Sequence, residues 1–307
     1  MASNNIFPYV SIARGNSVKS IQHLNNDLSF SACPICQGKE IKTIGPVKYS
    51  KMIFADTPIE LKNTSYYAYC LHCKSGFIQN SIQEKDANEL YAAKSSQRWI
   101  SNIPFTERRT KKTVKLIADL LVPQKRILDI GCSTGQLLEF AKQFNCECYG
   151  VESSKPAQKI CRERGYKCFS SINDIKIFAP FDIVFLIDTI EHIYDVPAFL
   201  NGLSQLLQND GQIVILTGDI NSVPAKIFKN NWWYLGFTEH IVFPSVKCFT
   251  IFRDFRIKYH LKTYAFKSSQ EKARKKILSS LMKLLLHKSN GHKFFLPDHY
   301  CVVLKKN

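Results

Sequence analysis

The sequence predicts an α/β protein built on a doubly wound parallel sheet with helices on both faces. Three observations predict this class. Strand-like and helix-like segments alternate from about residue 106 onward. A turn that carries two glycines joins the first predicted strand to the helix after it. Two cysteine pairs precede this region and indicate a second, smaller domain.

The predicted elements follow one another in a regular order. A helical stretch at residues 110–121 comes first, and Pro123 ends it. The expected strands are residues 126–130, 148–152, 167–169, 181–187 and 211–217, and the expected helices between them are residues 136–144, 155–164 and 196–207. Segments that alternate at this spacing are typical of parallel βαβ units.

The composition divides the chain further. Residues 1–32 are polar and rich in Asn and Ser, residues 33–80 begin and end with cysteine pairs, and residues 81–105 form a partly helical linker. Residues 106–307 then carry the predicted sheet. A chain of 307 residues has room for about two domains, which fits this division.

The charge of the chain is strongly positive, with 42 Lys and Arg against 25 Asp and Glu. Such a balance favours an anionic partner: nucleic acid, an anionic membrane surface or a phosphorylated substrate. Most of the excess lies in residues 253–307, and residues 271–288 predict a basic amphipathic helix. This helix has two interpretations. It rests on an anionic membrane and reaches a lipid-linked substrate, or it packs on protein as a lid or in a homodimer.

The expected location is cytoplasmic, or peripheral at the inner membrane face if the basic helix binds lipid. No apolar run approaches the roughly 18 residues of a membrane span, and the first residues lack the pattern of a secretory signal. In a reducing compartment the 11 cysteines are expected to be thiols or metal ligands.

The cysteine pairs, Cys33 with Cys36 and Cys70 with Cys73, have the C-x-x-C spacing of zinc knuckles. Four sulfur ligands leave no open position, so we expect a structural Zn²⁺ without a catalytic role. The alternatives are four unrelated thiols or a redox pair, and neither pair opens a helix after a strand as a redox pair does. Zinc removal is expected to unfold residues 33–80 and to leave the sheet domain standing.

The glycine turn is the most informative stretch. An apolar strand runs into Asp129, the turn carries Gly131 and Gly135, and a helix starts directly after it. Glycines allow the backbone to approach a ligand, and the helix N-terminus offers free amides. Glu152 ends the next strand, where a carboxylate accepts the ribose hydroxyls of an adenosine-containing cofactor.

Three other kinds of site also place glycines between a strand and a helix. This turn lacks the G-x-G-x-x-G of a dinucleotide site and the Gly-Lys-Ser/Thr of a phosphate-binding loop. It does fit the G-x-S-x-G pattern of an α/β-hydrolase with Ser133 as nucleophile. No His-Gly-Gly-Gly segment precedes it, however, and a hydrolase gives Asp129 and Glu152 no task.

Several motifs together resemble one known family. Residues 129–135 resemble motif I of class I S-adenosylmethionine-dependent methyltransferases, and Glu152 resembles their ribose-binding acid. Residues 181–192 and 210–217 are similar to the motifs of the fourth and fifth strands in that family. Residues 232–245 resemble the "W…EH…S" segment of the branch that includes ubiquinone-biosynthesis and sugar methyltransferases.

The resemblance implies a seven-stranded Rossmann-like methyltransferase sheet, with residues 300–304 as an antiparallel last strand, behind an N-terminal zinc-ribbon-like domain. It implies that the amino-acid end of S-adenosylmethionine lies over the glycine turn with Asp129 near its ammonium group. The implied cofactor-binding residues are Asp129, Gly131, Cys132, Ser133, Gly135, Glu152, Ser171, Ile172, Asp174, Ile187 and Asp188. From the residues alone, Ser171 and Asp174 fit a helix-capping turn equally well.

Methyl transfer to a hydroxyl needs a base near the methyl group. We expect His192 and His240 as candidate bases, with Glu191 orienting His192. Alternatively, Asp188, Glu191 and His192 hold a second divalent cation that clamps a diol, as an analogous set does in quinone-pathway relatives. A purely structural role, with both histidines packed beneath or over the site, is the remaining interpretation.

The sequence therefore predicts an enzyme that methylates a hydroxyl or a carbon of a small-molecule or saccharide acceptor. The alternatives are a nucleic-acid (RNA) methyltransferase, the hydrolase with Ser133, and a protein that binds S-adenosylmethionine without catalysis. The chain lacks the Asn/Asp-Pro-Pro-Tyr/Phe segment of enzymes that methylate base amines, which disfavours a nucleic-acid substrate.

Overall fold

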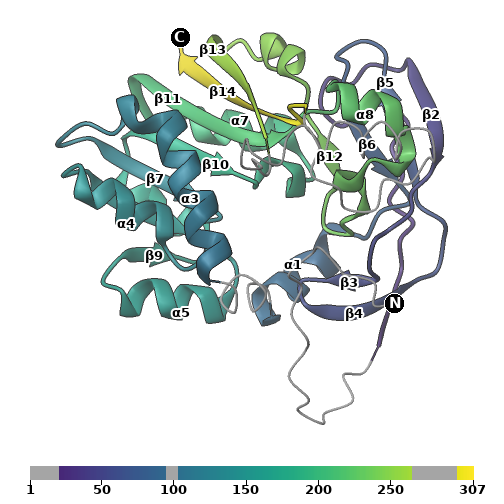
Figure 1. Cartoon of the computed structure of the whole chain (residues 1–307), viewed down its shortest axis with the longest axis horizontal. Coiled ribbons are helices and arrows are strands. Elements are labelled where there is room, and N and C mark those ends of the chain that lie inside the picture. Colours follow the sequence, from purple (N-terminus) through teal and green to yellow (C-terminus); the bar gives the residue numbers. More distant parts are fainter. Residues whose placement is uncertain (1–20, 95–102, 265–295) are drawn as a thin grey trace, which may run out of the picture.

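The computed structural model describes residues 21–94, 103–264 and 296–307. Within these ranges a seven-stranded sheet has the order β13-β14-β11-β10-β7-β8-β9 (Figure 1). Its strands are β7 (Arg126–Ile130), β8 (Glu147–Val151), β9 (Lys167–Phe169), β10 (Phe181–Ile187), β11 (Leu207–Gly218), β13 (Phe255–Thr263) and β14 (His299–Lys306). The neighbouring strands β9, β8, β7, β10 and β11 are parallel to one another, and β14 is antiparallel to β11. The predicted fold class and the antiparallel last strand are confirmed.

Helices cover both faces of this sheet (Figure 1). One face packs against α3 (Ile103–Ile117) and α4 (Gln136–Gln143) through Val114 and Leu137. The other packs against α7 (Val196–Ser204) through Leu200 and Leu203. The remaining helices are α1 (Glu84–Lys94), α5 (Lys155–Glu163), α6 (Ile172–Ile175) and α8 (Val223–Phe228).

The first helix of the sheet region begins earlier than its sequence pattern indicates. It was expected at residues 110–121, but α3 starts at Ile103, and a 3-10 turn at Ala118–Leu120 replaces its expected end. Pro104 lies in the first turn of α3, where the missing amide of proline costs nothing. A proline near the start of a helical stretch was thus the signal for the earlier boundary.

The N-terminal part of the chain forms two smaller sheets. The three-stranded sheet contains β1 (Gln22–Leu24), β3 (Ile53–Phe54) and β4 (Thr57–Leu61), and the four-stranded sheet contains β2 (Ile41–Pro46), β5 (Tyr66–Cys70), β6 (Gly76–Gln79) and β12 (Val242–Phe243). β12 pairs with β6 although it lies beyond α8 in the chain (Figure 1). The division of the chain at residue 80 remains a prediction, and this sheet contains strands from both sides of it.

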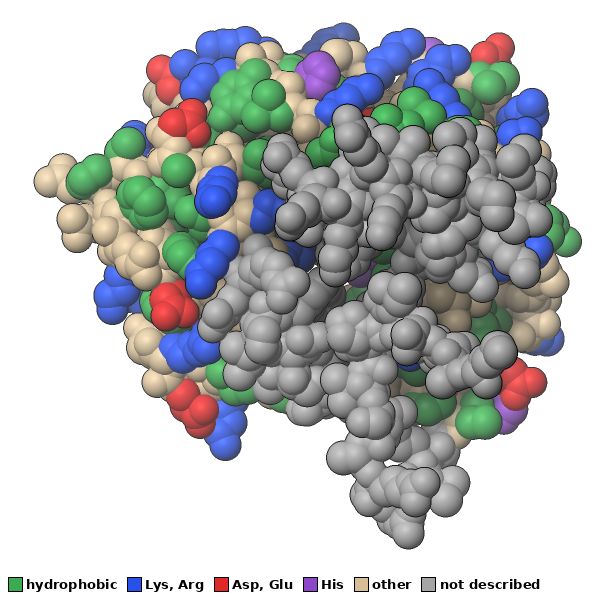
Figure 2. Space-filling view, in the orientation of Figure 1, with side chains coloured by type: hydrophobic (Ala, Val, Ile, Leu, Met, Phe, Trp, Pro, Cys, Tyr) green, Lys and Arg blue, Asp and Glu red, His purple; other side chains and the backbone are tan. Residues whose placement is uncertain are grey.

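In the described part of the chain, no helix has the length and apolarity needed to cross a bilayer. On the face drawn in Figure 2, Lys and Arg side chains are spread among apolar and acidic ones. The predicted basic helix at residues 271–288 lies outside the described residues. Its membrane, lipid and homodimer interpretations therefore remain predictions.

Candidate active site

The turn between β7 and α4 has a backbone conformation that depends on its glycines. The φ angles of Gly131 and Gly135 are +78° and +85°, in the left-handed region that glycine adopts without strain. A Cβ atom at Gly131 would lie 2.6 Å from Thr189 Oγ1, which donates a hydrogen bond to the Ile130 carbonyl at 2.9 Å. The turn is therefore fixed closely against the end of β10, and the N-terminus of α4 follows directly.

Glu152 connects this turn to the start of α5. Its carboxylate accepts hydrogen bonds from the amides of Ser133 at 2.9 Å and Ser154 at 2.7 Å, one on each oxygen. The side chain is buried, and burial raises the pKa of this carboxyl above its usual value. Oε2 keeps a second lone pair, and Oε1 accepts only a long bond from Ser153 Oγ at 3.5 Å that a ligand hydroxyl can replace, so Glu152 can accept two hydroxyl groups of a ligand.

A second buried carboxyl, Asp129, ends β7 beside the turn. Burial, and then the charge of Glu152, raises the pKa of Asp129 to about 8. Two buried carboxyl groups at one edge of the sheet disfavour their own ionisation unless a cation lies near them. This part of the molecule is therefore suited to a ligand that carries a positive charge.

Two buried polar atoms near the turn have no hydrogen-bond partner among the described residues: Ser133 Oγ and Asp188 Oδ1. The other oxygen of Asp188, Oδ2, accepts a hydrogen bond from Arg109 Nε at 2.6 Å and also contacts Arg109 Nη2. Buried groups without partners are costly, and a bound ligand that hydrogen-bonds to both atoms would remove that cost. Before Asp188, the carbonyl of Ile187 accepts a bond from Thr189 Oγ1 at 3.2 Å.

Ser171 and Asp174 form a capping box at the start of α6. The amide of Asp174 donates to Ser171 Oγ at 3.3 Å, and the amide of Ser171 donates to Asp174 Oδ2 at 3.0 Å. Ile172 is half-buried and packs against the main core. Ser171 and Asp174 therefore cap α6, as one of the two interpretations expected. Their position beside an adenine remains a prediction.

Glu191, His192 and His240 lie together, each with a potential metal-ligand atom within 4.8 Å of the others. The carboxylate of Glu191 accepts hydrogen bonds from Thr217 Oγ1 at 2.9 Å and from the Tyr234 hydroxyl. Burial raises the pKa of Glu191 to about 7, with the charge of Asp188 as the next cause. The predicted partner Asp188 is not a member of this cluster.

Both histidines have Nδ1 next to a backbone carbonyl. His240 Nδ1 is 2.8 Å from the Tyr234 oxygen, and His192 Nδ1 is 3.0 Å from the Glu239 oxygen and 2.9 Å from the Tyr91 hydroxyl. Because a carbonyl only accepts, we assign the ring proton of His240 to Nδ1, which leaves a lone pair on its Nε2. The Tyr91 hydroxyl can donate to His192 Nδ1, so both tautomers of His192 fit its contacts. Burial lowers the pKa of both rings, that of His240 most strongly, so both are neutral near pH 7.

The four knuckle cysteines also come together. The Sγ atoms of Cys33 and Cys73 are 3.7 Å apart, and those of Cys36 and Cys70 are 3.6 Å apart. Zinc–sulfur bonds of about 2.3 Å in a tetrahedron place sulfurs about 3.8 Å from one another. The Gly38 amide donates to Cys36 Sγ at 3.4 Å, as in knuckle turns. This donor set fits Zn²⁺.

Four residues that contact the site were not identified from the sequence. Tyr91 and Arg109 contact His192 and Asp188 across 101 and 79 residues, and no local pattern indicates such pairs. Tyr234 and Glu239 lie inside the segment 232–245, which resembles the "W…EH…S" motif but from which only His240 was predicted to have a role in the reaction. The aromatic residues of that segment were therefore the available signal for Tyr234.

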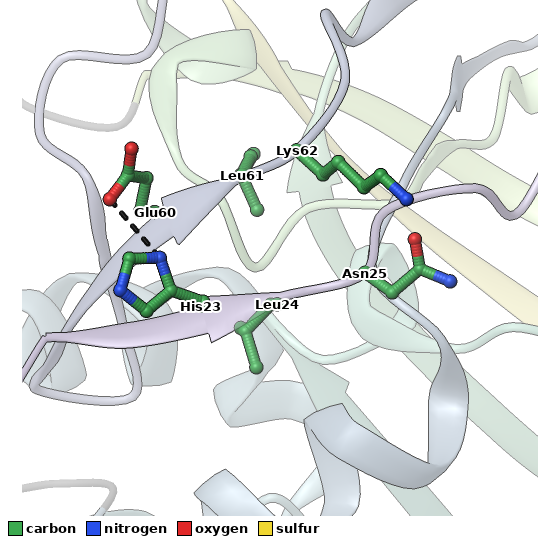
Figure 3. Close-up of a pocket in the computed structure, with 6 residues that line it drawn as sticks. All are labelled: His23, Leu24, Asn25, Glu60, Leu61 and Lys62. Atoms are coloured by element: carbon green, nitrogen blue, oxygen red, sulfur yellow. Dashed lines mark ion pairs between the residues drawn. The ribbon is translucent and has the colours of Figure 1, made fainter.

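A separate surface depression lies between β1 and β4 (Figure 3). His23 and Glu60 form an exposed ion pair there, with 3.2 Å between Nδ1 and Oε2. Exposed pairs of this kind contribute little to stability. None of the predicted site residues lines this depression, so it has no part in the candidate active site.

The chain has relatives of known class. Residues 103–250 match the family model described as "Methyltransferase domain". The ubiquinone biosynthesis O-methyltransferase of Bradyrhizobium sp. (strain ORS 278) is 34% identical over 100 residues, 30% of this chain and 39% of the relative. The (S)-tetrahydroprotoberberine N-methyltransferase of Eschscholzia californica is 25% identical over 142 residues, 41% of this chain and 38% of the relative. The chain thus spans about two fifths of the length of these relatives.

A solved structure of a SAM dependent methyltransferase from Archaeoglobus fulgidus is 20% identical, with a TM-score of 0.47, over 68% of this chain and 100% of that chain. The family match makes residues 103–250 similar to a methyltransferase domain. The resemblance predicted from the motifs is therefore confirmed.

Proposed function

We propose that the chain transfers a methyl group from S-adenosylmethionine to a hydroxyl or carbon of a small-molecule or saccharide acceptor. The observation that best supports this proposal is the pair of buried carboxyls, Asp129 and Glu152, beside the glycine turn in the part of the chain that matches a methyltransferase domain. The matched relatives include a ubiquinone biosynthesis O-methyltransferase, which supports a small-molecule acceptor.

In this proposal Glu152 accepts the ribose hydroxyls with its remaining lone pairs, and Asp129 faces the ammonium group. The partnerless Ser133 Oγ and Asp188 Oδ1 gain hydrogen-bond partners from the methionine part. The cofactor supplies an activated methyl on a sulfonium, so the protein contributes mainly alignment. As a hydrolase nucleophile, Ser133 would need a base within hydrogen-bond reach, and its Oγ has no partner among the described residues.

The acceptor hydroxyl loses its proton to a neutral imidazole. His240 holds Nδ1 against the Tyr234 carbonyl, which leaves Nε2 as its basic atom, and His192 lies beside it with Nδ1 near the Glu239 carbonyl and the Tyr91 hydroxyl. The same arrangement is typical of histidines that bind a metal. A divalent cation is therefore the alternative means of activation, and Glu191, His192 and His240 are then its ligands in place of the expected Asp188 set.

The test is transfer of labelled methyl from S-adenosylmethionine to a panel of phenols and saccharides. We expect His240→Ala and His192→Ala each to lower kcat by about 100-fold and to change cofactor affinity little, because a general base acts on the acceptor alone. The matched control is His260→Ala, since His260 is exposed on β13. Normal turnover in both site variants would contradict both the proposed imidazole base and the alternative divalent cation.

The cation alternative has its own measurement. Mild chelation that leaves the knuckle zinc in place, as checked by metal analysis, should abolish activity if a second ion is required. Added Mg²⁺ or Mn²⁺ should then restore it. Unchanged activity after such treatment would favour the imidazole base. Cofactor binding without transfer to any acceptor would instead support a binding protein.

Cofactor binding is expected to release protons from Asp129. The pKa of Asp129 is raised to about 8 by burial and then by Glu152, so below this pH the free protein holds the carboxyl largely protonated. An ammonium neighbour favours the ionised form, so affinity should rise with pH up to about 8. Calorimetry at neutral pH in two buffers of different ionisation enthalpy should show proton release for the wild type and much less for Asp129→Asn. Equal release from both proteins would contradict this assignment.

A further inference from the structure

Three cysteines lie in contact beneath the glycine turn. Cys132 belongs to the turn itself, Cys161 to α5 and Cys168 to β9. All three side chains are buried, and their sulfurs lie within 4.8 Å of one another. The Sγ atoms of Cys132 and Cys168 are 3.7 Å apart. The proposed function uses none of these sulfurs.

Two glycines lie next to the three sulfurs, at positions where any larger residue would place its side chain against a sulfur atom. β8 runs between β7 and β9, and Gly150 near its C-terminal end pairs with Asp129 on one side and Cys168 on the other. A Cβ atom at Gly150 would lie 2.6 Å from Cys132 Sγ, and one at Gly135 would lie 2.9 Å from Cys161 Sγ. The absence of these side chains lets sulfurs from three separate elements meet.

The spacing of these sulfurs matches that of the knuckle in the same chain. The 3.7 Å between Cys132 and Cys168 equals the 3.7 Å between Cys33 and Cys73. It is also close to the separation of about 3.8 Å between sulfurs on one tetrahedral zinc. Three clustered thiols around one point are the ligand set that soft ions select over oxygen and nitrogen sites.

The surroundings suit a thiolate site. Leu138 and Tyr166 pack around the sulfurs and exclude water. Arg162, next to Cys161 in the chain, donates from Nε to the Cys168 carbonyl at 2.8 Å. Three thiolates on a divalent ion leave one net negative charge, which this fixed guanidinium offsets in part. The nearby Asp129 carboxyl disfavours a Cys132 thiolate only when it is ionised, and its burial keeps it largely protonated near neutral pH.

We propose that Cys132, Cys161 and Cys168 form a second thiolate metal site, with three sulfur ligands for a soft ion such as Cd²⁺, Zn²⁺ or Cu⁺. Binding replaces the thiol protons by sulfur–metal bonds and releases those protons to solvent, without any change in oxidation state. A bound ion would tie together the turn, α5 and β9. The turn and the start of α5 are also the elements whose amides hold Glu152.

The test is titration of the full, reduced chain with ¹¹³Cd²⁺, followed by metal analysis and ¹¹³Cd NMR. The wild type should bind two equivalents and give two sulfur-ligated resonances, one from the knuckle and one from the new site. Cys161→Ser and Cys168→Ser should each lose one equivalent and one resonance. Cys301→Ser should keep both, because Cys301 is buried on β14 outside either cluster.

The knuckle resonance in each variant reports on the knuckle alone, so wild-type circular dichroism and wild-type affinity for S-adenosylmethionine are required to show that the sheet around Cys161 and Cys168 has folded. A wild type that binds only the knuckle equivalent would overturn the proposal, as would a second resonance that survives both site variants. A disulfide between Cys132 and Cys168, found by thiol counting in protein prepared without reductant, would also overturn it in favour of a redox pair.

Discussion

Replacing Glu152 with alanine is expected to weaken the binding of S-adenosylmethionine by at least about 100-fold. The proposed ribose contact consists of two hydrogen bonds to a charged acceptor, each contributing roughly 1.5 kcal/mol or more. About 3 kcal/mol corresponds to a little over two factors of ten in affinity. The variant also removes the acceptor for the Ser133 and Ser154 amides, which loosens the turn itself.

Glu152→Gln separates charge from shape. Its amide keeps one oxygen, but its NH₂ group must face the amide of either Ser133 or Ser154, donor against donor. We therefore expect weak binding from this nearly isosteric change as well. Glu163→Gln is the matched control, since Glu163 is exposed on α5 with only a surface pair to Lys159. Calorimetric affinity within a few-fold of wild type for Glu152→Ala would contradict the cofactor site.

The turn and its acid were predictable because both are encoded locally. Positive φ angles at Gly131 and Gly135 follow from glycine itself, and Glu152 follows from its place at the end of the next strand. The antiparallel last strand came from the family resemblance and is confirmed by the pairing of β14 with β11. Local geometry and family order together thus gave the fold and the edge of the sheet that the site occupies.

Contacts between distant segments could not be predicted in this way. The sequence grouped Asp188 with Glu191 and His192, yet the structure pairs Asp188 with Arg109 and brings His240 to the other two. Choosing among such partners depends on side-chain packing, which spacing along the chain does not describe. The three cysteines beneath the turn were missed for the same reason, because they meet only across Gly150.

Removing zinc from the knuckle is expected to abolish methyl transfer while leaving cofactor binding largely intact. The sequence predicted that the sheet domain stands alone without zinc, but the structure joins the knuckle to the segment that carries His240. Phe77 of β6 pairs with Val242 of β12, and Ser245 Oγ donates to the Cys73 carbonyl at 2.6 Å. Cys70 and Cys73 also share the main core with strands of the large sheet.

Structural zinc contributes about 10 kcal/mol or more to the folding of small domains, so its loss removes the support for β12. The glycine turn and Glu152 make their hydrogen bonds to elements of the large sheet and do not depend on the knuckle. We expect Cys73→Ser to reduce kcat by about 100-fold, with cofactor affinity nearly unchanged and faster amide exchange in residues 238–245. Cys301→Ser should show none of these effects.

If zinc-free protein lost cofactor binding and turnover together, the knuckle and the large sheet would be one cooperative unit. If it kept full turnover, the contact between Ser245 and Cys73 would have no role in placing His240.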